Sequence, residues 1–193
     1  ELRTLYAAQD KDYWFIGFHI TPTLGTPVWY GLYLDANQTD GQGATMAPPD
    51  RPTLTTSSYY QPEYALYVTY NGATLVTDRV DLYTWSADAL AWDSQVKNLV
   101  DAGEVGGALY YSATLGYVEL KIPRTAIGDR GDKPFSFSAV LFSTTSNTAS
   151  SASDTVPDNG SNPAVLNEFK TIGDRVTLAV PVGGLPEEDT ALP

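Results

Sequence analysis

The sequence contains no cysteine, a single histidine and a single methionine. Without cysteine the chain can form neither a disulfide bond nor a thiolate zinc site, and it has no cysteine nucleophile. Ser-His-Asp catalysis would have to depend on His19 alone, and no G-x-S-x-G motif accompanies that residue. No pair of carboxylates is singled out for glycoside hydrolysis either. We therefore expect a protein that is not an enzyme.

Basic residues are also scarce, because 11 Lys and Arg stand against 23 Asp and Glu and give a formal net charge of −12. Binding to nucleic acid or to anionic membranes requires Lys and Arg to neutralise phosphates, so this charge argues against both. No apolar run approaches the roughly 18 residues of a membrane-spanning helix, and the first residues do not resemble a signal peptide. Cations and neutral ligands are better candidate partners.

What the sequence does have is period-two alternation of apolar and polar residues, in short runs separated by Gly, Pro, Asn and Asp. This alternation is typical of β-strands, and 193 residues with 42% apolar content suffice for one substantial core. We predict an all-β fold, a single-domain antiparallel β-sandwich of jelly-roll type. The predicted strands are Leu2–Ala8, Tyr13–Ile20, Val28–Leu34, Glu63–Tyr70, Arg79–Trp85, Gly107–Tyr111, Tyr117–Ile122, Phe135–Phe142 and Asp174–Val180.

Helical structure is expected at two short segments only. Pro123 can begin a helical turn that Gly128 ends, and Gln95–Ala102 is predicted as a second short helix. Two long irregular stretches, Asp35–Pro62 and Ser143–Pro163, interrupt the strands, and loops longer than about 12 to 15 residues are usually functional or disordered. The sandwich domain is assigned to residues 1–182, followed by an acidic tail or linker at 183–193.

The first long stretch contains LDANQTDGQG, in which Asp35, Asn37 and Asp40 fall within six residues, while Gly41 and Gly43 let the backbone fold back. Calcium prefers about six to eight oxygen ligands, and such a loop can supply several of them. The spacing is not that of an EF-hand, because Asp40 comes one residue late and no Glu closes the loop. We predict a calcium site at these three residues, with an ordinary Asx-rich turn as the alternative.

Aromatic residues are abundant, with four tryptophans and 13 tyrosines. Exposed aromatic rings bind sugars because the apolar C–H face of a sugar ring stacks on the π surface. Trp85 and Trp92 flank a short polar turn, Trp29 opens the strand that leads to the acidic loop, and Tyr59 and Tyr60 lie in an aromatic stretch. We predict these five as ligand-binding residues. The alternative is that most of them fill the core or pair across strands.

Seven segments together resemble the glucodextranase C-terminal-like module of the DOMON and family 9 carbohydrate-binding group. They are DYWFIGFHI, YGLYLDANQTDGQGAT, PEYALYV, DLYTWS, GALYYSATLGYVELKIPRTAIG, SDTVPDNG and FKTIGDRVTLAVP. The resemblance covers about Leu2 to Pro181, and such modules occur beside catalytic domains in secreted amylolytic enzymes such as pullulanases. It implies an extracellular jelly-roll sandwich without catalysis of its own, which frequently binds calcium and attaches to polysaccharide or cell-surface glycan. By this resemblance Asp35, Asn37 and Asp40 become the calcium ligands.

The resemblance is incomplete at its start, because that family normally opens with a further strand carrying a D-G-x-x-x-D-W-type stretch, whereas this chain begins at ELRTLYAAQD. A sandwich that lacks a strand leaves backbone groups unpaired along an edge. Residues after Val180, in the same chain or from another copy, are expected to fill that edge, and head-to-tail filling would build a filament. We therefore predict a calcium-stabilised carbohydrate-binding module, with a structural subunit of an extracellular filament or surface layer as the alternative.

Overall fold

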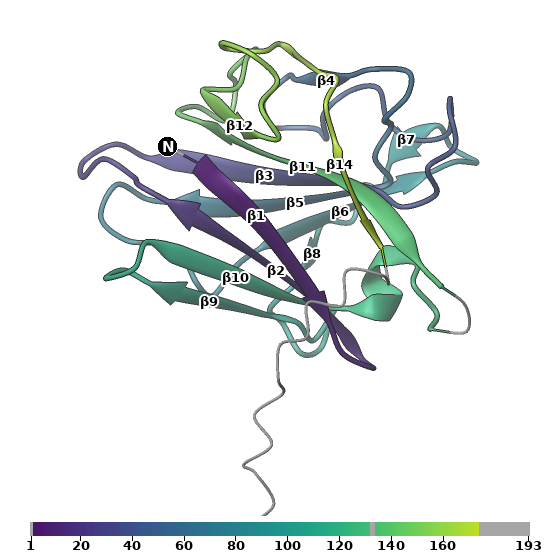
Figure 1. The fold of residues 1–193 in the computed structure, drawn as a ribbon, viewed down its shortest axis with the longest axis horizontal. Coiled ribbons are helices and arrows are strands. Elements are labelled where there is room, and N and C mark those ends of the chain that lie inside the picture. The colour runs from purple at the N-terminus through teal and green to yellow at the C-terminus, as the bar shows by residue number, and fades with distance from the viewer. Residues whose placement is uncertain (1, 132–133, 174–193) are drawn as a thin grey trace, which may run out of the picture.

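Strands make up nearly all the regular structure of the protein (Figure 1). The structure is a computed structural model that describes residues 2–131 and 134–173. One 3₁₀ helix, η1 (Arg124–Ile127), is present in this part of the chain. The strands are β1 (Leu2–Gln9), β2 (Tyr13–Ile20), β3 (Val28–Asp35), β4 (Thr55–Thr56), β5 (Tyr64–Tyr70), β6 (Asp81–Ser86), β7 (Ala91–Trp92), β8 (Lys97–Asn98), β9 (Ala108–Ser112), β10 (Tyr117–Pro123), β11 (Ser136–Thr144), β12 (Asp154–Val156), β13 (Val165–Leu166) and β14 (Lys170–Gly173).

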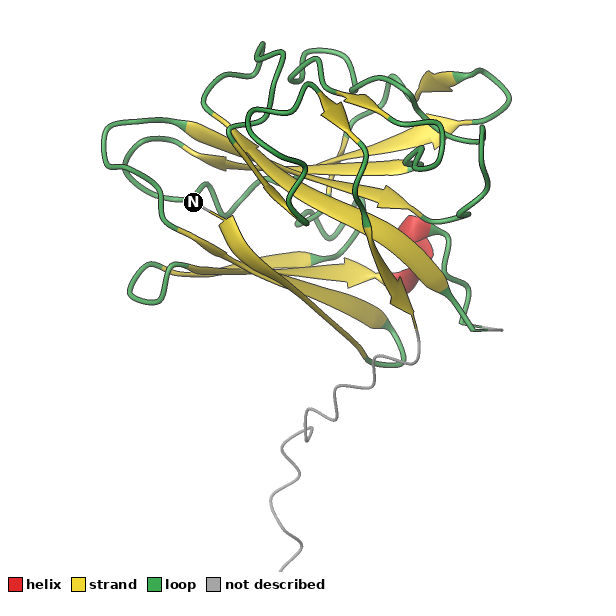
Figure 2. Ribbon diagram, turned by 45° about the horizontal axis from the view of Figure 1, so that its top comes forward, coloured by secondary structure: helices red, strands yellow, loops and turns green. Residues whose placement is uncertain are grey.

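Two antiparallel sheets pack face to face, which confirms the predicted β-sandwich (Figures 1 and 2). The smaller sheet has the strand order β1-β2-β10-β9. The larger follows the order β12-β11-β3-β5-β6-β7, with β14 on β11 and β8 on β6. Alternation in β2 explains the packing, because Trp14, Ile16, Phe18 and Ile20 all point into the core between the sheets and are buried.

Eight of the nine predicted strands are present, with ends shifted by two residues at most. The ninth, Asp174–Val180, lies outside the described residues, as does the tail at 183–193. The predicted turn at 123–128 is also confirmed, since it forms η1. Pro123 precedes the helix, and Gly128 ends it in the left-handed region with φ of 80°.

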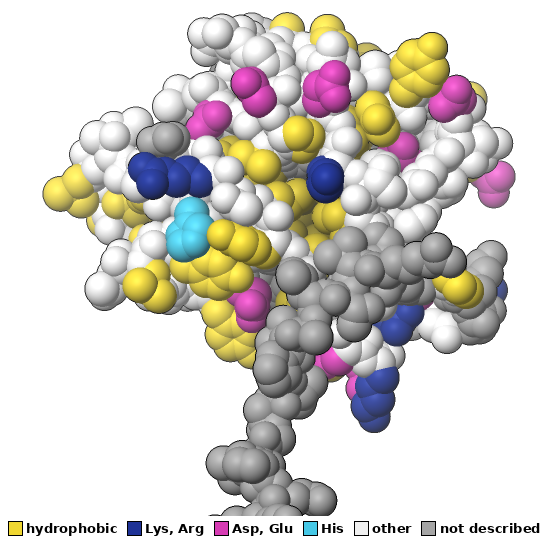
Figure 3. Space-filling view, in the orientation of Figure 1, with side chains coloured by type: hydrophobic (Ala, Val, Ile, Leu, Met, Phe, Trp, Pro, Cys, Tyr) yellow, Lys and Arg dark blue, Asp and Glu magenta, His cyan; other side chains and the backbone are white. Residues whose placement is uncertain are grey.

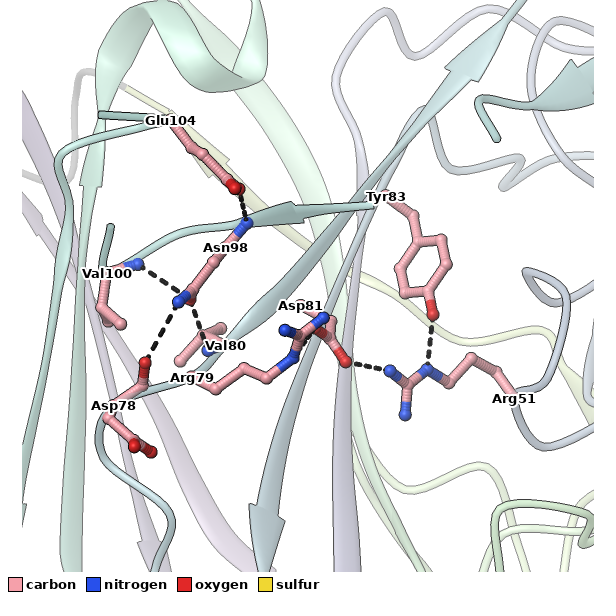
Figure 4. Close-up of polar contacts among 9 residues, drawn as sticks. All are labelled: Arg51, Asp78, Arg79, Val80, Asp81, Tyr83, Asn98, Val100 and Glu104. Carbon is pink, nitrogen blue, oxygen red and sulfur yellow. Dashed lines mark hydrogen bonds and ion pairs between the residues drawn. The ribbon is translucent and has the colours of Figure 1, made fainter. Parts of the chain in front are cut away.

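The predicted helix at Gln95–Ala102 is wrong, because this segment contributes strand β8 to the larger sheet instead. The Asn98 side chain fixes the segment there, accepting a hydrogen bond from the Val80 N–H at 3.0 Å and donating one to the Asp78 carbonyl at 3.1 Å (Figure 4). These bonds join residues about 20 positions apart. Tertiary contacts of this kind override weak local helix propensity.

The two long irregular stretches form a cover over the outer face of the larger sheet. They bind each other through the Thr53 N–H and the Ala149 carbonyl at 2.7 Å. In addition, β4 of the first stretch pairs in parallel with β13, which follows the second. Beneath them lies a second apolar cluster, separate from the core between the sheets. Its buried residues are Tyr33, Leu54, Ala65, Tyr67, Tyr83, Val140, Phe142, Ala152, Leu166 and Phe169. The two sheets therefore differ, because no such loop layer is built over the smaller sheet by the described residues.

Within residues 2–131 and 134–173, no helix has the length and apolar character needed to cross a membrane.

Candidate functional site

The predicted metal loop begins at Asp35, the last residue of β3. Its side chain is only 2% exposed, and its Oδ1 accepts a hydrogen bond from the Gln38 N–H at 2.7 Å. Asn37 and Asp40 lie further along the loop and are exposed. The structure thus places Asp35 at the buried base of the loop and the other two predicted ligands at its surface.

Glu63, which the sequence analysis missed, holds the base of this loop. Its Oε2 accepts hydrogen bonds from the Ala36 N–H at 2.7 Å and the Asn37 N–H at 3.2 Å, and its Oε1 accepts one from the Asn37 side-chain amide at 2.7 Å. Asn37 Oδ1 accepts the Thr39 N–H at 2.7 Å. Asn37 therefore closes the loop with both ends of its amide.

The two carboxyl groups at the base lie in an environment that disfavours their charged forms. Burial raises the pKa of Asp35 to about 6, against the hydrogen bond from Gln38 and with a further contribution from Asp40. Burial likewise raises the pKa of Glu63 to about 7, and the nearby Asp35 adds to the effect. Within the described part of the chain, neither carboxylate has a Lys or Arg at ion-pair distance. Their negative charge is thus not compensated by a basic side chain.

The described residues contain no group of three or more Asp, Glu, His or Cys side chains arranged to hold one ion. Of the predicted trio, Asp35 is buried while Asn37 and Asp40 are exposed, and a calcium site at these three residues stays a prediction. The donor chemistry suits a hard cation, since the loop carries carboxylate, side-chain amide and hydroxyl oxygens beside its backbone carbonyls. The uncompensated charge of Asp35 and Glu63 is the feature that a divalent cation would neutralise.

The five predicted aromatic ligands do not form one surface. Trp85 and Trp92 face each other across β6 and β7, edge to face, with ring centroids 5.7 Å apart. Tyr60 packs against the second cluster, stacked on Phe169 at 4.7 Å. Tyr59 stands alone in a turn, 68% exposed, and Trp29 is half-buried near the start of β3. Only the Trp85 and Trp92 pair is brought together as a candidate binding element.

A groove of about 440 Å³ has a lining that includes Met46, Pro48, Pro49, Asp50, Arg51 and Thr53. Trp92 holds one of these lining residues, since its indole N–H donates to the Met46 carbonyl at 2.8 Å. Arg51, another lining residue, donates to the Tyr83 hydroxyl at 2.8 Å and forms an ion pair with Asp81 (Figure 4). The groove is therefore held by the larger sheet beneath it.

The outer face of the smaller sheet carries an aromatic surface that the sequence analysis did not identify. Tyr6 of β1, His19 of β2 and Tyr117 of β10 lie together on it, with ring centroids 5.2 to 6.3 Å apart. The Tyr117 ring leans across β2 so that its hydroxyl end lies over Gly17, and a Cβ atom at position 17 would overlap that hydroxyl. Glycine at this position is therefore what lets the ring lie against the sheet. We call Tyr6, Gly17, His19 and Tyr117 the aromatic face.

Further rings and polar groups continue the aromatic face across the sheet. Phe15 and Tyr13 follow along β2, with the Lys121 ammonium 3.9 Å from the centroid of the Tyr13 ring. Tyr110 of β9 lies opposite Glu119 and is 55% exposed. Figure 3 shows the single histidine side chain, in cyan, beside hydrophobic side chains on the visible surface. Rings thus alternate with hydrogen-bonding groups over several strands.

A signal for this surface was present in the sequence. In YWFIGFHI the residues Tyr13, Phe15, Gly17 and His19 alternate with the buried Trp14, Ile16, Phe18 and Ile20. The outward residues of the strand are thus largely aromatic instead of charged or small polar, which is unusual for a solvated face. Listing the residue types on both faces of each predicted strand would have identified these outward aromatic residues.

Comparison of the chain with protein-family models, with curated proteins and with solved structures gave no match. The resemblance to the glucodextranase C-terminal-like module therefore stays a prediction.

Proposed function

We propose that the protein is a non-catalytic extracellular module that binds polysaccharide or cell-surface glycan on the aromatic face. The observation that carries this proposal is the position of Tyr117 over Gly17, flanked by Tyr6 and His19. Contiguous aromatic groups that reach the surface of an otherwise polar protein mark interaction surfaces, and Tyr6 is exposed here while His19 and Tyr117 are half-buried. In the described part of the larger sheet, by contrast, many outer rings are covered by loops with their own apolar cluster.

The chemistry of the aromatic face suits a sugar chain. A pyranose ring offers one apolar C–H face and a rim of hydroxyl groups, and it needs both a ring to stack on and nearby donors and acceptors. Tyrosine supplies both features in one side chain, while His19, Glu119 and Lys121 add further polar atoms. The surface spans β1, β2, β10 and β9, and within the described part of the chain it is an extended sheet face. That shape favours several successive sugar units over one enclosed monosaccharide.

Calcium has a stabilising part in this proposal, at a distance from the sugar. Asp35 and Glu63 are the carboxyl groups whose charge it would neutralise, with help from loop carbonyl oxygens, and the Asn37 amide would keep the loop closed. Binding would offset the cost of keeping Asp35 and Glu63 ionised near neutral pH. The support for calcium is this uncompensated charge and not a preformed set of ligands.

A pull-down with insoluble polysaccharides, followed by a glycan array, tests the proposal. Binding should be lost in Tyr117→Ala and weakened in Tyr6→Ala, because each substitution removes one stacking ring. Tyr59→Ala is the matched control, since that ring is exposed but isolated. If Trp85→Ala or Trp92→Ala abolishes binding while Tyr117→Ala does not, the ligand binds at the tryptophan pair and not on the aromatic face. Absence of binding to any glycan would refute the proposed function.

The alternative function is a structural subunit of an extracellular filament or surface layer, assembled by strand complementation. One observation favours it: within the described part of the chain, β1 and β9 each pair with a neighbour on one side only. Sheet edges of this kind accept an added strand. Negative-stain micrographs decide between the two functions, because the filament subunit should form fibres that disappear when residues 184–193 are deleted.

A further inference from the structure

Strand β9 has one edge that no described segment pairs with from Ala108 to Ser112, although directly before the strand the Gly107 N–H donates to the Leu99 carbonyl at 2.8 Å. It pairs with β10 alone, in continuous register from Ala108 to Ser112 (Figure 1). The direction of its backbone groups follows from the neighbouring strands. The Ile20 N–H donates to the Gly116 carbonyl at 2.7 Å, and hydrogen-bonded pairs alternate along antiparallel strands. The N–H and C=O groups of Leu109 and Tyr111 therefore point away from β10, into the open edge.

The open edge of β9 lacks three features that commonly protect an edge strand. Protected edges carry charged side chains, proline or a β-bulge. The sequence of β9, ALYYS, has no charge and no proline, and its pairing with β10 shows no register shift. Strand β1, at the opposite side of the same sheet, has a shift between Leu2 and Leu5 and carries Arg3. Of the two edges of this sheet, the β1 edge thus carries features that oppose strand pairing, and the β9 edge does not.

We infer that β9 pairs with β9 of a second copy of this chain, antiparallel and about a two-fold axis at Tyr110. In this register Leu109 of one copy lies opposite Tyr111 of the other, and the outward backbone groups of both residues are hydrogen-bonded. Tyr110 meets its own counterpart in the intervening non-hydrogen-bonded position. The two four-stranded sheets become one continuous sheet across the pair.

A second copy fits this edge better than an unrelated strand because the edge is complementary to itself. Two-fold pairing requires the same surface on both partners, and the Leu109 and Tyr111 positions are symmetric about Tyr110. A chain with a net charge of −12 can associate with itself only where acidic groups do not meet. On the outer side of the sheet, Glu119 lies one strand inward from Tyr110, and three strand spacings of about 4.8 Å place the two copies of Glu119 about 14 Å apart. That separation exceeds the Debye length of about 8 Å at physiological salt.

The pairing does not depend on carbohydrate binding, but it would extend the aromatic face. Tyr110 lies on the outer side of the sheet with Glu119 and Tyr117, so two aromatic faces would adjoin through the two Tyr110 rings. A polymer that bridged both would bind more tightly than to either alone.

Sedimentation velocity over a range of protein concentrations tests the inference. The chain should sediment as a reversible dimer, and Tyr110→Lys should weaken self-association at least tenfold, since it places two like charges side by side at the axis. Tyr59→Lys adds the same charge at an exposed turn and should leave the dimer unchanged. A monomer at every concentration, or a dimer insensitive to Tyr110→Lys, would overturn the pairing.

Cross-linking gives an independent test that does not require destabilising the pair. Non-hydrogen-bonded residues lie with Cα atoms about 4.5 Å apart, within the range of about 4.4 to 6.8 Å that a disulfide spans. Because the chain has no cysteine, Tyr110→Cys should form a covalent dimer under mild oxidation, whereas Tyr6→Cys on β1 should not. Equal yields from both variants would contradict the proposed register.

Hydrogen exchange supplies a third readout, because the Leu109 and Tyr111 amides should lose protection from exchange when the protein is diluted. Protection that persists on dilution would show that another part of the chain occupies the edge.

Discussion

The carboxyl pair Asp35 and Glu63 predicts an unusual pH dependence of stability. In the folded protein the pKa of Asp35 is raised from 3.8 to about 6 and that of Glu63 from 4.5 to about 7. Between the unfolded and folded values the native state binds more protons than the unfolded state, so stability falls as pH rises. The contribution of each group is fully present below its unfolded pKa and is lost as pH rises through about 6 for Asp35 and about 7 for Glu63.

The magnitude follows from the pKa values. One pKa unit corresponds to about 1.4 kcal/mol, so the full contribution of Asp35 is about 3 kcal/mol, of which about 2 kcal/mol is lost above pH 4.5. Glu63 is only half-buried, and solvent screening reduces its part to roughly 1 to 2 kcal/mol. In the presence of EGTA, the free energy of unfolding should fall by about 3 to 4 kcal/mol between pH 4.5 and pH 8 because of these two groups.

Urea denaturation at successive pH values measures this fall, and the double variant Asp35→Asn, Glu63→Gln isolates it. The variant should show a flatter profile, while Asp88→Asn, which removes one exposed carboxylate elsewhere, should follow the wild type. Excess calcium at pH 8 should stabilise the wild type, by about 2.7 kcal/mol at one hundred times its dissociation constant, and leave the double variant unchanged. Parallel profiles for wild type and double variant would refute the pKa argument. If excess calcium leaves the stability of the wild type unchanged, the metal site is refuted but the pKa argument is not.

Two further predictions concern ion pairs elsewhere. Arg51→Met should lower the free energy of unfolding by about 1 to 3 kcal/mol in thermal or urea denaturation, because it removes a cation from the largely buried Asp81 and a hydrogen-bond donor from the Tyr83 hydroxyl. Arg79 forms an ion pair with the same Asp81, but its side chain is 58% exposed, so Arg79→Met should cost under about 1 kcal/mol. Equal losses of stability in the two variants would contradict the larger role given to Arg51. For Asp129, burial alone would raise the pKa, but hydrogen bonds from Arg124, Trp14 and Gly131 outweigh it and keep the pKa below its ordinary range. Asp129→Asn should therefore destabilise the protein at pH 7 and progressively less as pH falls below about 4; a loss that does not change with pH would contradict this reading.

The strands were predictable because their side chains follow a local rule. In β2 every inward residue is buried, and every outward residue except Gly17 is partly exposed. A window of eight residues therefore contains the whole alternation that predicts the strand. The short strands carry no such signal. β4 and β13 have two residues each, and their pairing depends on contacts such as the Thr55 N–H with the Ala164 carbonyl at 3.0 Å, between segments far apart in the chain. Periodicity cannot reveal an element held by its partner alone.

The candidate sites show the same limit. Asp35, Asn37 and Asp40 were found because they are neighbours in sequence, whereas Glu63, which organises their loop, lies 26 residues from Asn37. Tyr117 was not recognised because its ring lies in the space left by the missing side chain of Gly17, on the adjacent strand. The aromatic residues that the sequence singled out by local density were mostly packing groups, as Tyr60 on Phe169 illustrates.

The position of the long loops connects these results. Loop length suggested that function would lie in Asp35–Pro62 and Ser143–Pro163, yet much of both stretches serves to bury the outer rings of the larger sheet, with Leu54 and Ala152 fully enclosed. Ordering so much backbone costs conformational entropy, which the second apolar cluster offsets. A sandwich that covers one sheet in this way and leaves aromatic groups on the other has two chemically different faces. Strand β9 lies at the margin of that surface, so pairing through it would enlarge the binding face while leaving the loop layer untouched.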